Sequence, residues 1–217
     1  MKLSEIVVKP VVSSLFQQNG YVVHRKGEKD CFVIDPGLEP ELFLELFEKK
    51  GFSPVALLVT HGHGDHIGGI GVLREKWKSA KIHIGELDGE KLTDPKKNLS
   101  TNFGIGFTTP QADVLLKDGD KLDLAGITIE VRHVPGHSKG LVVYLIPTEP
   151  KGMVFVGDAI FQGNIGRSDF PDSDPAIQIP MIRSKILSLP DDTVIYPGHG
   201  DSTTVGTERR TNPFLTK

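Results

Sequence analysis

The sequence has one cysteine, few aromatic residues and no long apolar run. Because Cys31 is alone, the chain forms no internal disulfide, and a reducing cytoplasm is the expected location. Glu5, Lys9 and Pro10 interrupt the N-terminal segment, which therefore does not resemble a secretory signal. No stretch approaches the roughly 20 apolar residues that a membrane span needs, so no membrane association is expected.

The chain also lacks a large excess of charge of either sign. Its 217 residues include 25 Lys and Arg against 28 Asp and Glu, which gives a formal net charge of −3. Such a balance creates no global positive field that would hold a polyphosphate backbone, and nucleic acid is not expected as a ligand. One small basic cluster falls near the end of a predicted helix, where the helix dipole favours positive charge, and we interpret it as a solvated face: Arg74, Lys76, Lys78 and Lys81.

Short β-branched runs bounded by turn residues alternate with a few amphipathic stretches. Strands are predicted at residues 6–12, 21–24, 31–34, 56–59, 82–84, 127–134, 141–146, 153–156 and 193–196, and helices at 40–50, 67–78 and 174–189. This order favours an α/β fold with layered sheets and outer helices over a pure β-sandwich. No repeat or linker divides the chain, so a single domain over residues 1–217 is expected. Residues 96–112 lack periodicity and predict a loop that covers a site.

A dense group of metal-ligating residue types follows the apolar run at 56–59. His61, His63, Asp65 and His66 form an H-x-H-x-D-H pattern within the glycine-containing segment THGHGDH. At the His and Asp frequencies of this chain, the pattern would arise in roughly one shuffled sequence per thousand. Imidazole and carboxylate are ligands of divalent transition metals, and glycine lets the loop turn several of them toward one point. The pattern therefore predicts a metal site.

Three more residues of the same types stand at comparable places. His137, Asp158 and His199 each come just after an apolar strand and beside a glycine. Taken alone, each also has a structural explanation, as a turn histidine or a capping aspartate. Strand ends that meet at one edge of a sheet are, however, where α/β proteins build their sites, so we expect these residues to complete the metal site.

These residues carry a resemblance to a known superfamily. The segment VIDPG at 33–37, the H-x-H-x-D-H run at 61–66, His137, Asp158 and His199 together resemble the metallo-β-lactamase fold. The resemblance spans the chain and implies a four-layer αββα sandwich with a two-metal centre at one edge.

The resemblance also implies a role for each residue of the centre. One metal is held by His61, His63 and His137, the other by Asp65, His66 and His199, and Asp158 bridges the two. Asp35 lies behind these ligands and fixes their loop by hydrogen bonds, although an ordinary Asp-Pro-Gly turn explains Asp35 equally well from sequence alone.

Two adjacent divalent ions supply hydroxide at neutral pH, and Asp65 is the expected catalytic residue that orients it. Zinc is the expected metal, with iron or a mixed iron–zinc pair as alternatives. Nucleophilic serine or cysteine chemistry is not expected, because the chain has no G-x-S-x-G elbow and Cys31 lies in an apolar strand where a thiolate is disfavoured.

Two flanking segments narrow the resemblance to one branch. Residues 161–171 and 204–214 resemble glyoxalase II (hydroxyacylglutathione hydrolase), especially its short single-domain type. This implies a thioesterase that cleaves S-acylglutathione, for example S-lactoylglutathione, as a monomer or a small homo-oligomer. Arg167 is the candidate that binds a substrate carboxylate, and the alternative is a surface arginine that joins loops. The chain departs from the full-length enzymes at Asp169 and Asp201, where they carry tyrosines.

Two other functions remain as alternatives. The run GRSDF at 166–170 also resembles persulfide dioxygenases, which use a single iron held by equivalents of His61, His137 and Asp158. Against this, the residues after His66 are more similar to those of the hydrolases. The second alternative is an interaction protein that keeps the fold without catalysis, which the complete ligand set disfavours.

The remaining candidates are interpreted as structural. His24, His83 and His133 alternate with apolar neighbours in predicted strands, and Trp77 closes an amphipathic helix where it packs against the core. Arg209 and Arg210 are expected to form a salt bridge within the C-terminal tail.

Overall fold

Two six-stranded β-sheets face each other in the computed structural model, which describes residues 2–216. The first sheet has the order β1-β2-β3-β4-β5-β6, and its strands are β1 (Ile6–Val12), β2 (Asn19–Arg25), β3 (Asp30–Ile34), β4 (Ser53–Val59), β5 (Lys81–Gly85) and β6 (Val114–Leu116). The second has the order β14-β13-β10-β9-β8-β7, with β7 (Lys121–Leu124), β8 (Ile127–His133), β9 (Val142–Ile146), β10 (Met153–Gly157), β13 (Val194–Pro197) and β14 (Thr203–Thr204). A small hairpin, β11 (Ile160–Phe161) and β12 (Asn164–Ile165), stands apart.

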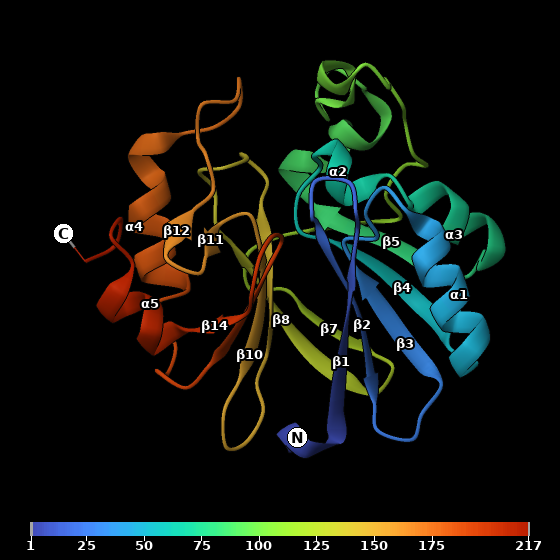
Figure 1. Ribbon diagram of the computed structural model, residues 1–217, viewed down its shortest axis with the longest axis horizontal. Helices are drawn as coiled ribbons and strands as arrows, with labels where there is room; N and C mark the ends of the chain where they lie inside the picture. The colour runs from blue at the N-terminus through green and yellow to red at the C-terminus, as the bar shows by residue number, and fades with distance from the viewer. Residues whose placement is uncertain (1, 217) are drawn as a thin grey trace.

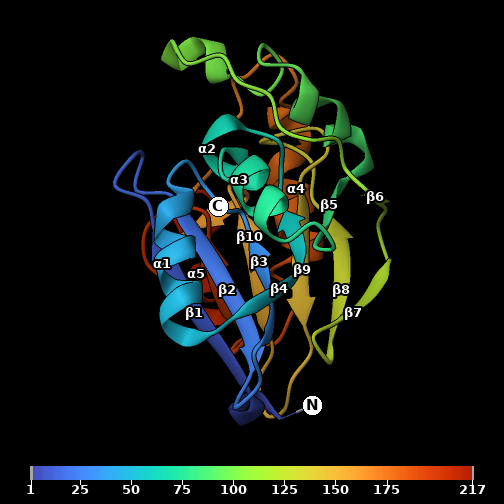
Figure 2. The ribbon, with the colours of Figure 1, turned by 90° about the vertical axis from the view of Figure 1, so that its right-hand side faces the viewer.

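Helices cover the outer faces of both sheets. The α-helices are α1 (Pro40–Lys50), α2 (Gly64–Ile67), α3 (Ile70–Lys76), α4 (Pro175–Lys185) and α5 (Val205–Thr211), with 3₁₀ segments at Leu3–Glu5, Glu86–Thr93 and Ser100–Phe103. α1 and α3 lie against the first sheet, and α4 and α5 lie against the second (Figure 1). Figure 2 looks onto these layers from the side of α1 and α3, which lie in front of the strands. The predicted αββα sandwich is therefore confirmed.

The apolar faces of these elements form three cores. Phe32, Tyr144 and Phe155 fill the space between the two sheets. Phe47 of α1 packs in the core beside the first sheet, and Ile182 of α4 packs in the core beside the second. Burying each such side chain contributes about 1.5–3 kcal/mol relative to leaving it in water. The Tyr144 hydroxyl donates a 2.7 Å hydrogen bond to the Val59 carbonyl and so ties the second sheet to the end of β4.

The predicted strands are all present, but several boundaries and short elements differ from expectation. The helix expected at 67–78 is two shorter helices, because the chain breaks at Gly68 and Gly69, where the Gly69 amide donates to the Gly37 carbonyl. The helix expected at 174–189 ends at Lys185, and the Asp174 side chain caps its N-terminus by accepting from the Ala176 amide. The sequence analysis missed β6, β7, the β11–β12 hairpin, β14 and α5, which are mostly too short to show periodicity.

The topology gathers strand ends at one edge of the sandwich. β3, β4 and β5 run parallel, so the segments that follow Ile34 and Val59 leave the first sheet side by side. In the second sheet β10 and β13 also run parallel, with Gly157 opposite Pro197. The residues that follow β3, β4, β10 and β13 therefore meet at the same edge. Within residues 2–216, no helix is both long and apolar enough to cross a bilayer.

Candidate metal centre

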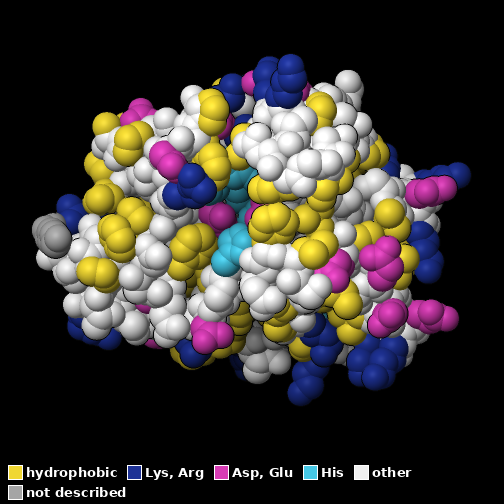
Figure 3. Space-filling view, turned by 45° about the horizontal axis from the view of Figure 1, so that its top comes forward, with side chains coloured by type: hydrophobic (Ala, Val, Ile, Leu, Met, Phe, Trp, Pro, Cys, Tyr) yellow, Lys and Arg dark blue, Asp and Glu magenta, His cyan; other side chains and the backbone are white. Residues whose placement is uncertain are grey.

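The side chains predicted as ligands converge at this edge from both sheets. His61 and His63 follow β4, Asp65 and His66 lie in α2, His137 lies between β8 and β9, Asp158 follows β10, and His199 follows β13. Their ligating atoms form three overlapping groups in which all atoms lie within 4.8 Å of one another. In the space-filling view, histidine side chains emerge in a narrow hollow between hydrophobic side chains (Figure 3).

The first group consists of three buried imidazoles. His137 Nε2 lies 3.2 Å from His61 Nε2 and 3.0 Å from His63 Nδ1. A tetrahedral zinc with bonds of 2.0–2.1 Å requires ligand nitrogens about 3.3 Å apart, so three imidazole nitrogens at this spacing fit one ion. Burial lowers the pKa of all three rings, most strongly for His61 and His63, and neighbouring histidines lower it further. The rings are thus held neutral, as metal ligands must be.

The second group combines a carboxylate with two imidazoles. Asp65 Oδ2 lies 3.3 Å from His199 Nε2 and 3.7 Å from His66 Nε2. Burial opposes a charge on His66, but the nearby carboxylates Asp65, Asp158 and Asp35 outweigh it and raise the pKa of His66 well above its ordinary value. The pKa of His199 is raised in the same way, chiefly through its hydrogen bond to Asp65. This group therefore binds protons more strongly than the first group does.

Asp158 lies between the two groups. Its Oδ1 is 3.3 Å from His66 Nε2, while its Oδ2 is 3.6 Å from His199 Nε2 and 3.7 Å from His137 Nε2. Burial alone would raise the pKa of this carboxyl, but the surrounding histidines outweigh it and hold the pKa below its usual range. The carboxylate therefore contacts ligands of both groups, as a bridge between two ions requires.

The unpaired atoms of the centre fit a pair of cations. Among the described residues, His66 Nε2 and Asp158 Oδ1 are buried and lie 3.3 Å apart, but neither forms a well-aligned hydrogen bond. Buried polar atoms without partners cost free energy unless something else binds them. Both atoms lie among the other ligating atoms, and each offers a lone pair to a cation once His66 Nε2 has lost its proton. Divalent metal ions would satisfy them.

A second layer of hydrogen bonds orients the imidazoles. His66 Nδ1 donates to Asp35 Oδ2 at 3.0 Å, and His61 Nδ1 donates to Thr60 Oγ1, which itself donates to the same Asp35 oxygen. The Thr60 amide donates to Asp35 Oδ1 at 2.7 Å. Asp35 adopts a left-handed φ of 50°, a costly conformation for a non-glycine residue that is kept by these contacts. The interpretation of Asp35 as a residue that fixes the ligand loop thus has a geometric basis.

Backbone carbonyls orient two further rings. His137 Nδ1 donates to the Arg167 carbonyl at 2.7 Å, and His199 Nδ1 donates to the Phe16 carbonyl at 3.0 Å. Each bond leaves Nε2 directed at the centre. Sequence reasoning missed Thr60 and these carbonyls. A backbone carbonyl carries no residue signature, and Phe16 lies far from His199 in the chain.

Asp35→Asn is expected to weaken metal binding by about 10- to 100-fold, the usual effect of losing an outer partner of a ligating histidine. Both Asp35 oxygens accept hydrogen bonds, and an amide nitrogen cannot accept the one it would replace. Competition with a chelator of known affinity measures the change. Metal affinities equal to those of the unsubstituted protein would show that the contact has no orienting role.

Arg167 lies at the rim of the centre and is exposed. Its guanidinium forms a two-point ion pair with Asp169, through Nε to Oδ1 at 2.6 Å and Nη2 to Oδ2 at 2.8 Å. It also lies 4.6 Å above the ring of Phe170, which packs against His63 and His137. The side chain is therefore beside the ligands but already paired.

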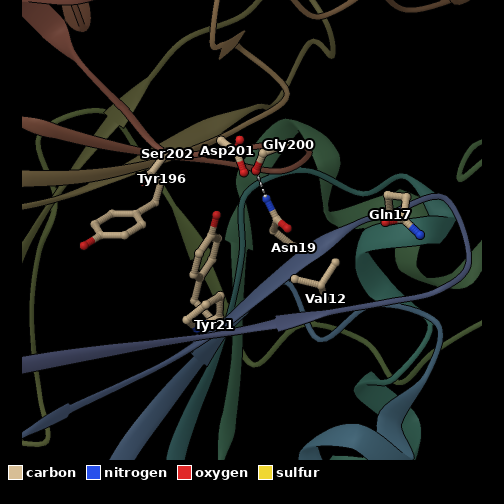
Figure 4. Close-up of a pocket in the computed structure, with 9 residues that line it drawn as sticks. Val12, Gln17, Asn19, Tyr21, Tyr196, Gly200, Asp201 and Ser202 are labelled. Atoms are coloured by element: carbon tan, nitrogen blue, oxygen red, sulfur yellow. Dashed lines mark hydrogen bonds between the residues drawn. The ribbon is translucent and has the colours of Figure 1, made fainter.

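A second opening lies beside the turn that carries His199. It is lined by Val12, Gln17, Asn19, Tyr21, Tyr196 and residues 200–202 (Figure 4). Asn19 Nδ2 donates to the Gly200 carbonyl at 2.7 Å, and the Tyr21 hydroxyl donates to the Pro197 carbonyl at 2.6 Å. These bonds join the β1–β2 hairpin to the His199 turn. Asp201 lies in this opening.

The loop at 96–112 contacts the segment that carries His63 and Asp65. The Asn98 carbonyl accepts the Gly64 amide at 2.7 Å, directly beside His63. At the tip, the Phe103 ring lies 4.7 Å from the ring of Phe16 on the β1–β2 loop, and both side chains are substantially exposed. The two loops thus contact each other through apolar side chains.

The residues interpreted as structural stay outside the three ligand groups. His24 Nδ1, His83 Nδ1 and His133 Nε2 are each within hydrogen-bond distance of a backbone carbonyl, and the Trp77 ring packs 5.1 Å from that of Phe47. The expectation for the C-terminal tail was wrong. Arg209 and Arg210 both pair with Asp191, which precedes β13, because α5 lies against the segment between α4 and β13. This contact is remote in sequence and had no local signal.

Comparison with known proteins agrees with this architecture. The profile of the metallo-beta-lactamase superfamily matches residues 14–199. The chain is 37% identical over 216 residues to hydroxyacylglutathione hydrolase GloC of Haemophilus influenzae, and the match covers 97% of each chain.

Two solved structures are also similar over nearly the whole chain. BLEG-1, a B3 metallo-beta-lactamase, is 35% identical with a TM-score of 0.92, and the match covers 97% of this chain and 100% of BLEG-1. TTHA1623 in a di-iron-bound form is 38% identical with a TM-score of 0.83, over 96% of this chain and 100% of TTHA1623. This chain therefore belongs to the metallo-beta-lactamase superfamily and shares its metal-binding hydrolase fold.

Proposed function

We propose that the protein is a two-metal thioesterase that hydrolyses S-acylglutathione. The observation that carries the proposal is the pair of ligand groups joined by Asp158, each with the residue types that divalent metals prefer. The similarity to GloC, named as a hydroxyacylglutathione hydrolase, supports the substrate class. The proposed metal ligands are His61, His63, Asp65, His66, His137, Asp158 and His199.

The reaction adds water to the thioester carbonyl and breaks the carbon–sulfur bond, which releases a carboxylic acid and a thiol. When bound, the two cations supply a water of lowered pKa and polarise the carbonyl oxygen. Asp65, with a side chain 14% exposed, would orient that water by accepting a hydrogen bond from it. A thiol has a solution pKa near 8.5, so the departing thiolate needs no dedicated general acid. The residues of this centre therefore suffice for thioester hydrolysis.

We propose zinc as the metal of both positions. Three imidazoles in the first group and two imidazoles with carboxylates in the second are donor sets that zinc accepts. The same donors accept iron, and the similarity to TTHA1623, solved in a di-iron-bound form, supports di-iron or mixed iron–zinc loading as the alternative. Metal analysis of protein purified without added ions distinguishes these cases.

Hydrolysis of S-lactoylglutathione, measured on protein of known metal content, tests the proposed function. We expect turnover that a chelator abolishes and that divalent metal restores. Thioesters of other thiols, offered at the same concentration, measure how far the activity depends on glutathione. The absence of thioester hydrolysis by fully loaded protein would contradict the proposal. Oxygen uptake on glutathione persulfide, with one iron per chain, would instead support the dioxygenase alternative.

β-Lactam hydrolysis is a second candidate because of the similarity to BLEG-1. Both reactions begin with attack of an activated water on a carbonyl carbon, so the same centre serves either one. A chromogenic cephalosporin assayed beside S-lactoylglutathione compares the two. We expect the thioester to have the higher kcat/KM, and the reverse order would favour a lactamase.

Arg167→Ala is expected to raise KM for anionic thioesters by about tenfold with a smaller loss of kcat, because the guanidinium binds a substrate carboxylate away from the reacting bond. Asp169→Asn is the matched variant. It removes the competing carboxylate that now pairs with Arg167, so its KM is not expected to rise. Initial rates over a range of substrate concentrations give both constants. An unchanged KM in Arg167→Ala would remove this residue from the binding site.

We also propose that the enzyme acts in the cytoplasm as a monomer or a small homo-oligomer. Cys31 is fully buried in β3, and burial raises the pKa of its thiol to about 12, so it is not reactive. The fold therefore depends on no disulfide.

A further inference from the structure

A buried ion pair lies behind the first ligand group. Asp88 and Lys91 come from the 3₁₀ segment Glu86–Thr93 and are 0% and 2% exposed. Lys91 Nζ lies 3.2 Å from Asp88 Oδ1. Desolvating two charges is costly, and a buried pair on its own is a weak source of stability. Neither residue takes part in the hydrolysis proposed above. The reason for burying this ion pair must therefore lie in the contacts that it makes.

Asp88 connects the two loops that carry the first ligand group. Its carboxylate accepts the Gly62 amide at 2.8 Å, and Gly62 stands between His61 and His63. It also accepts the hydroxyl of Ser138, the residue after His137, and the Gly140 amide at 2.9 Å. One carboxylate therefore holds the backbone beside all three imidazoles.

Lys91 extends the same network to a third segment. Its Nζ donates to Ser138 Oγ at 2.6 Å and pairs with Asp172 Oδ2 at 2.6 Å. Asp172 lies two residues after Phe170, whose ring packs 4.9 Å from that of His63 and 5.5 Å from that of His137. Lys91 thus joins both ligand loops to the segment that carries Phe170 and Asp172.

Glycines leave the space that this network needs. A Cβ at Gly62 would lie 2.6 Å from Lys91 Cβ, and a Cβ at Gly140 would lie 2.6 Å from Asp88 Oδ1. Both distances are shorter than real Cβ atoms allow, so the close approach of Asp88 and Lys91 to the two loops depends on glycine at both places.

We propose that Asp88 and Lys91 are positioning residues that set the spacing of His61, His63 and His137 and thereby the affinity for the first metal ion. The proposal rests on the ligand assignment given under the proposed function. It predicts a selective effect. Disturbing the network weakens the first metal position and leaves the second position, built from Asp65, His66 and His199, unchanged.

Lys91→Met tests this in the metal-loaded protein, because methionine keeps much of the stem and removes the charge. We expect the dissociation constant of the first metal to rise about 10- to 100-fold, with that of the second unchanged. Substitution with cobalt(II) gives a second readout. The absorption bands of the three-imidazole position are expected to shift, and His199→Ala, which lacks a ligand of the other position, assigns the bands.

Ser138→Ala provides a variant that disturbs packing less. It removes the hydroxyl shared by Asp88 and Lys91, and we expect the same selective loss at a smaller size, about 3- to 10-fold, with an unchanged unfolding temperature. If Lys91→Met does not fold, Ser138→Ala decides the question. Lys185→Met is the matched control, because it removes a lysine ion pair with Asp118 at the exposed end of α4, and wild-type affinities are expected.

The outcomes separate the two proposals. Wild-type protein that binds no metal would contradict the proposed function and this inference together. Wild-type protein that binds two ions, with unchanged affinities and cobalt bands in Lys91→Met and Ser138→Ala, would overturn this inference alone. Equal weakening of both positions would also overturn it, because the network would then act on the whole centre.

Discussion

Asp158→Ala is expected to lower kcat by about a thousandfold or more, because hydroxide at neutral pH depends on the bound cations and this carboxylate contacts ligands of both. Its two oxygens lie 3.3 to 3.7 Å from imidazole nitrogens of His66, His137 and His199. Alanine leaves both metal positions one ligand short. We therefore expect metal content to fall at both positions.

Metal analysis after dialysis, together with thioester hydrolysis at saturating substrate, measures this effect. Asp123→Ala is a suitable control, since Asp123 is an exposed residue of β7 whose side chain accepts only from Thr128 among the described residues. The control is expected to keep full activity and metal. Wild-type turnover by Asp158→Ala would refute the bridged two-metal centre.

Acidification is expected to remove metal from the second group before the first and to abolish activity at that step. Without metal, the pKa of His66 and His199 is raised, whereas the pKa of His61, His63 and His137 is lowered. As pH falls through the ordinary histidine pKa of about 6.5, protons therefore compete with metal at His66 and His199 while the first group is still neutral.

Metal content and turnover measured on the same samples between about pH 8 and pH 5 test this order. We expect one ion per chain to leave as turnover disappears and the other to leave at lower pH. Loss of both ions in a single step would contradict the difference between the groups. If turnover did not fall as the pH is lowered, activity would not require neutral imidazoles.

The sequence predicted the candidate centre because the residues proposed as its ligands have local signals. His61, His63, Asp65 and His66 stand within six residues of one another, and His137, Asp158 and His199 each follow an apolar run beside a glycine. A strand end followed by glycine and a ligand is a short-range pattern that can be read without knowing which strands pair. The layered fold was predictable for a related reason, since β-branched runs and amphipathic stretches alternate along the chain.

The outer contacts of the centre had no comparable signal. The carbonyls of Phe16 and Arg167 act through the backbone, so any residue at those positions would offer the same oxygen. Asp88 and Lys91 are charged residues three apart in a polar stretch, a pattern typical of a solvated turn, yet both are buried. Tertiary packing alone decides between those two outcomes.

The residues proposed as metal ligands are divided between the two sheets. His61, His63, Asp65 and His66 extend from the first sheet, whereas His137, Asp158 and His199 extend from the second. Under the proposed assignment, neither sheet supplies all the ligands of one metal ion. Bound metal ions would consequently cross-link the two sheets. Metal binding is therefore expected to raise the unfolding temperature of the protein as well as to supply the catalytic hydroxide. Fragments cut between the halves would regain turnover only on reassembly.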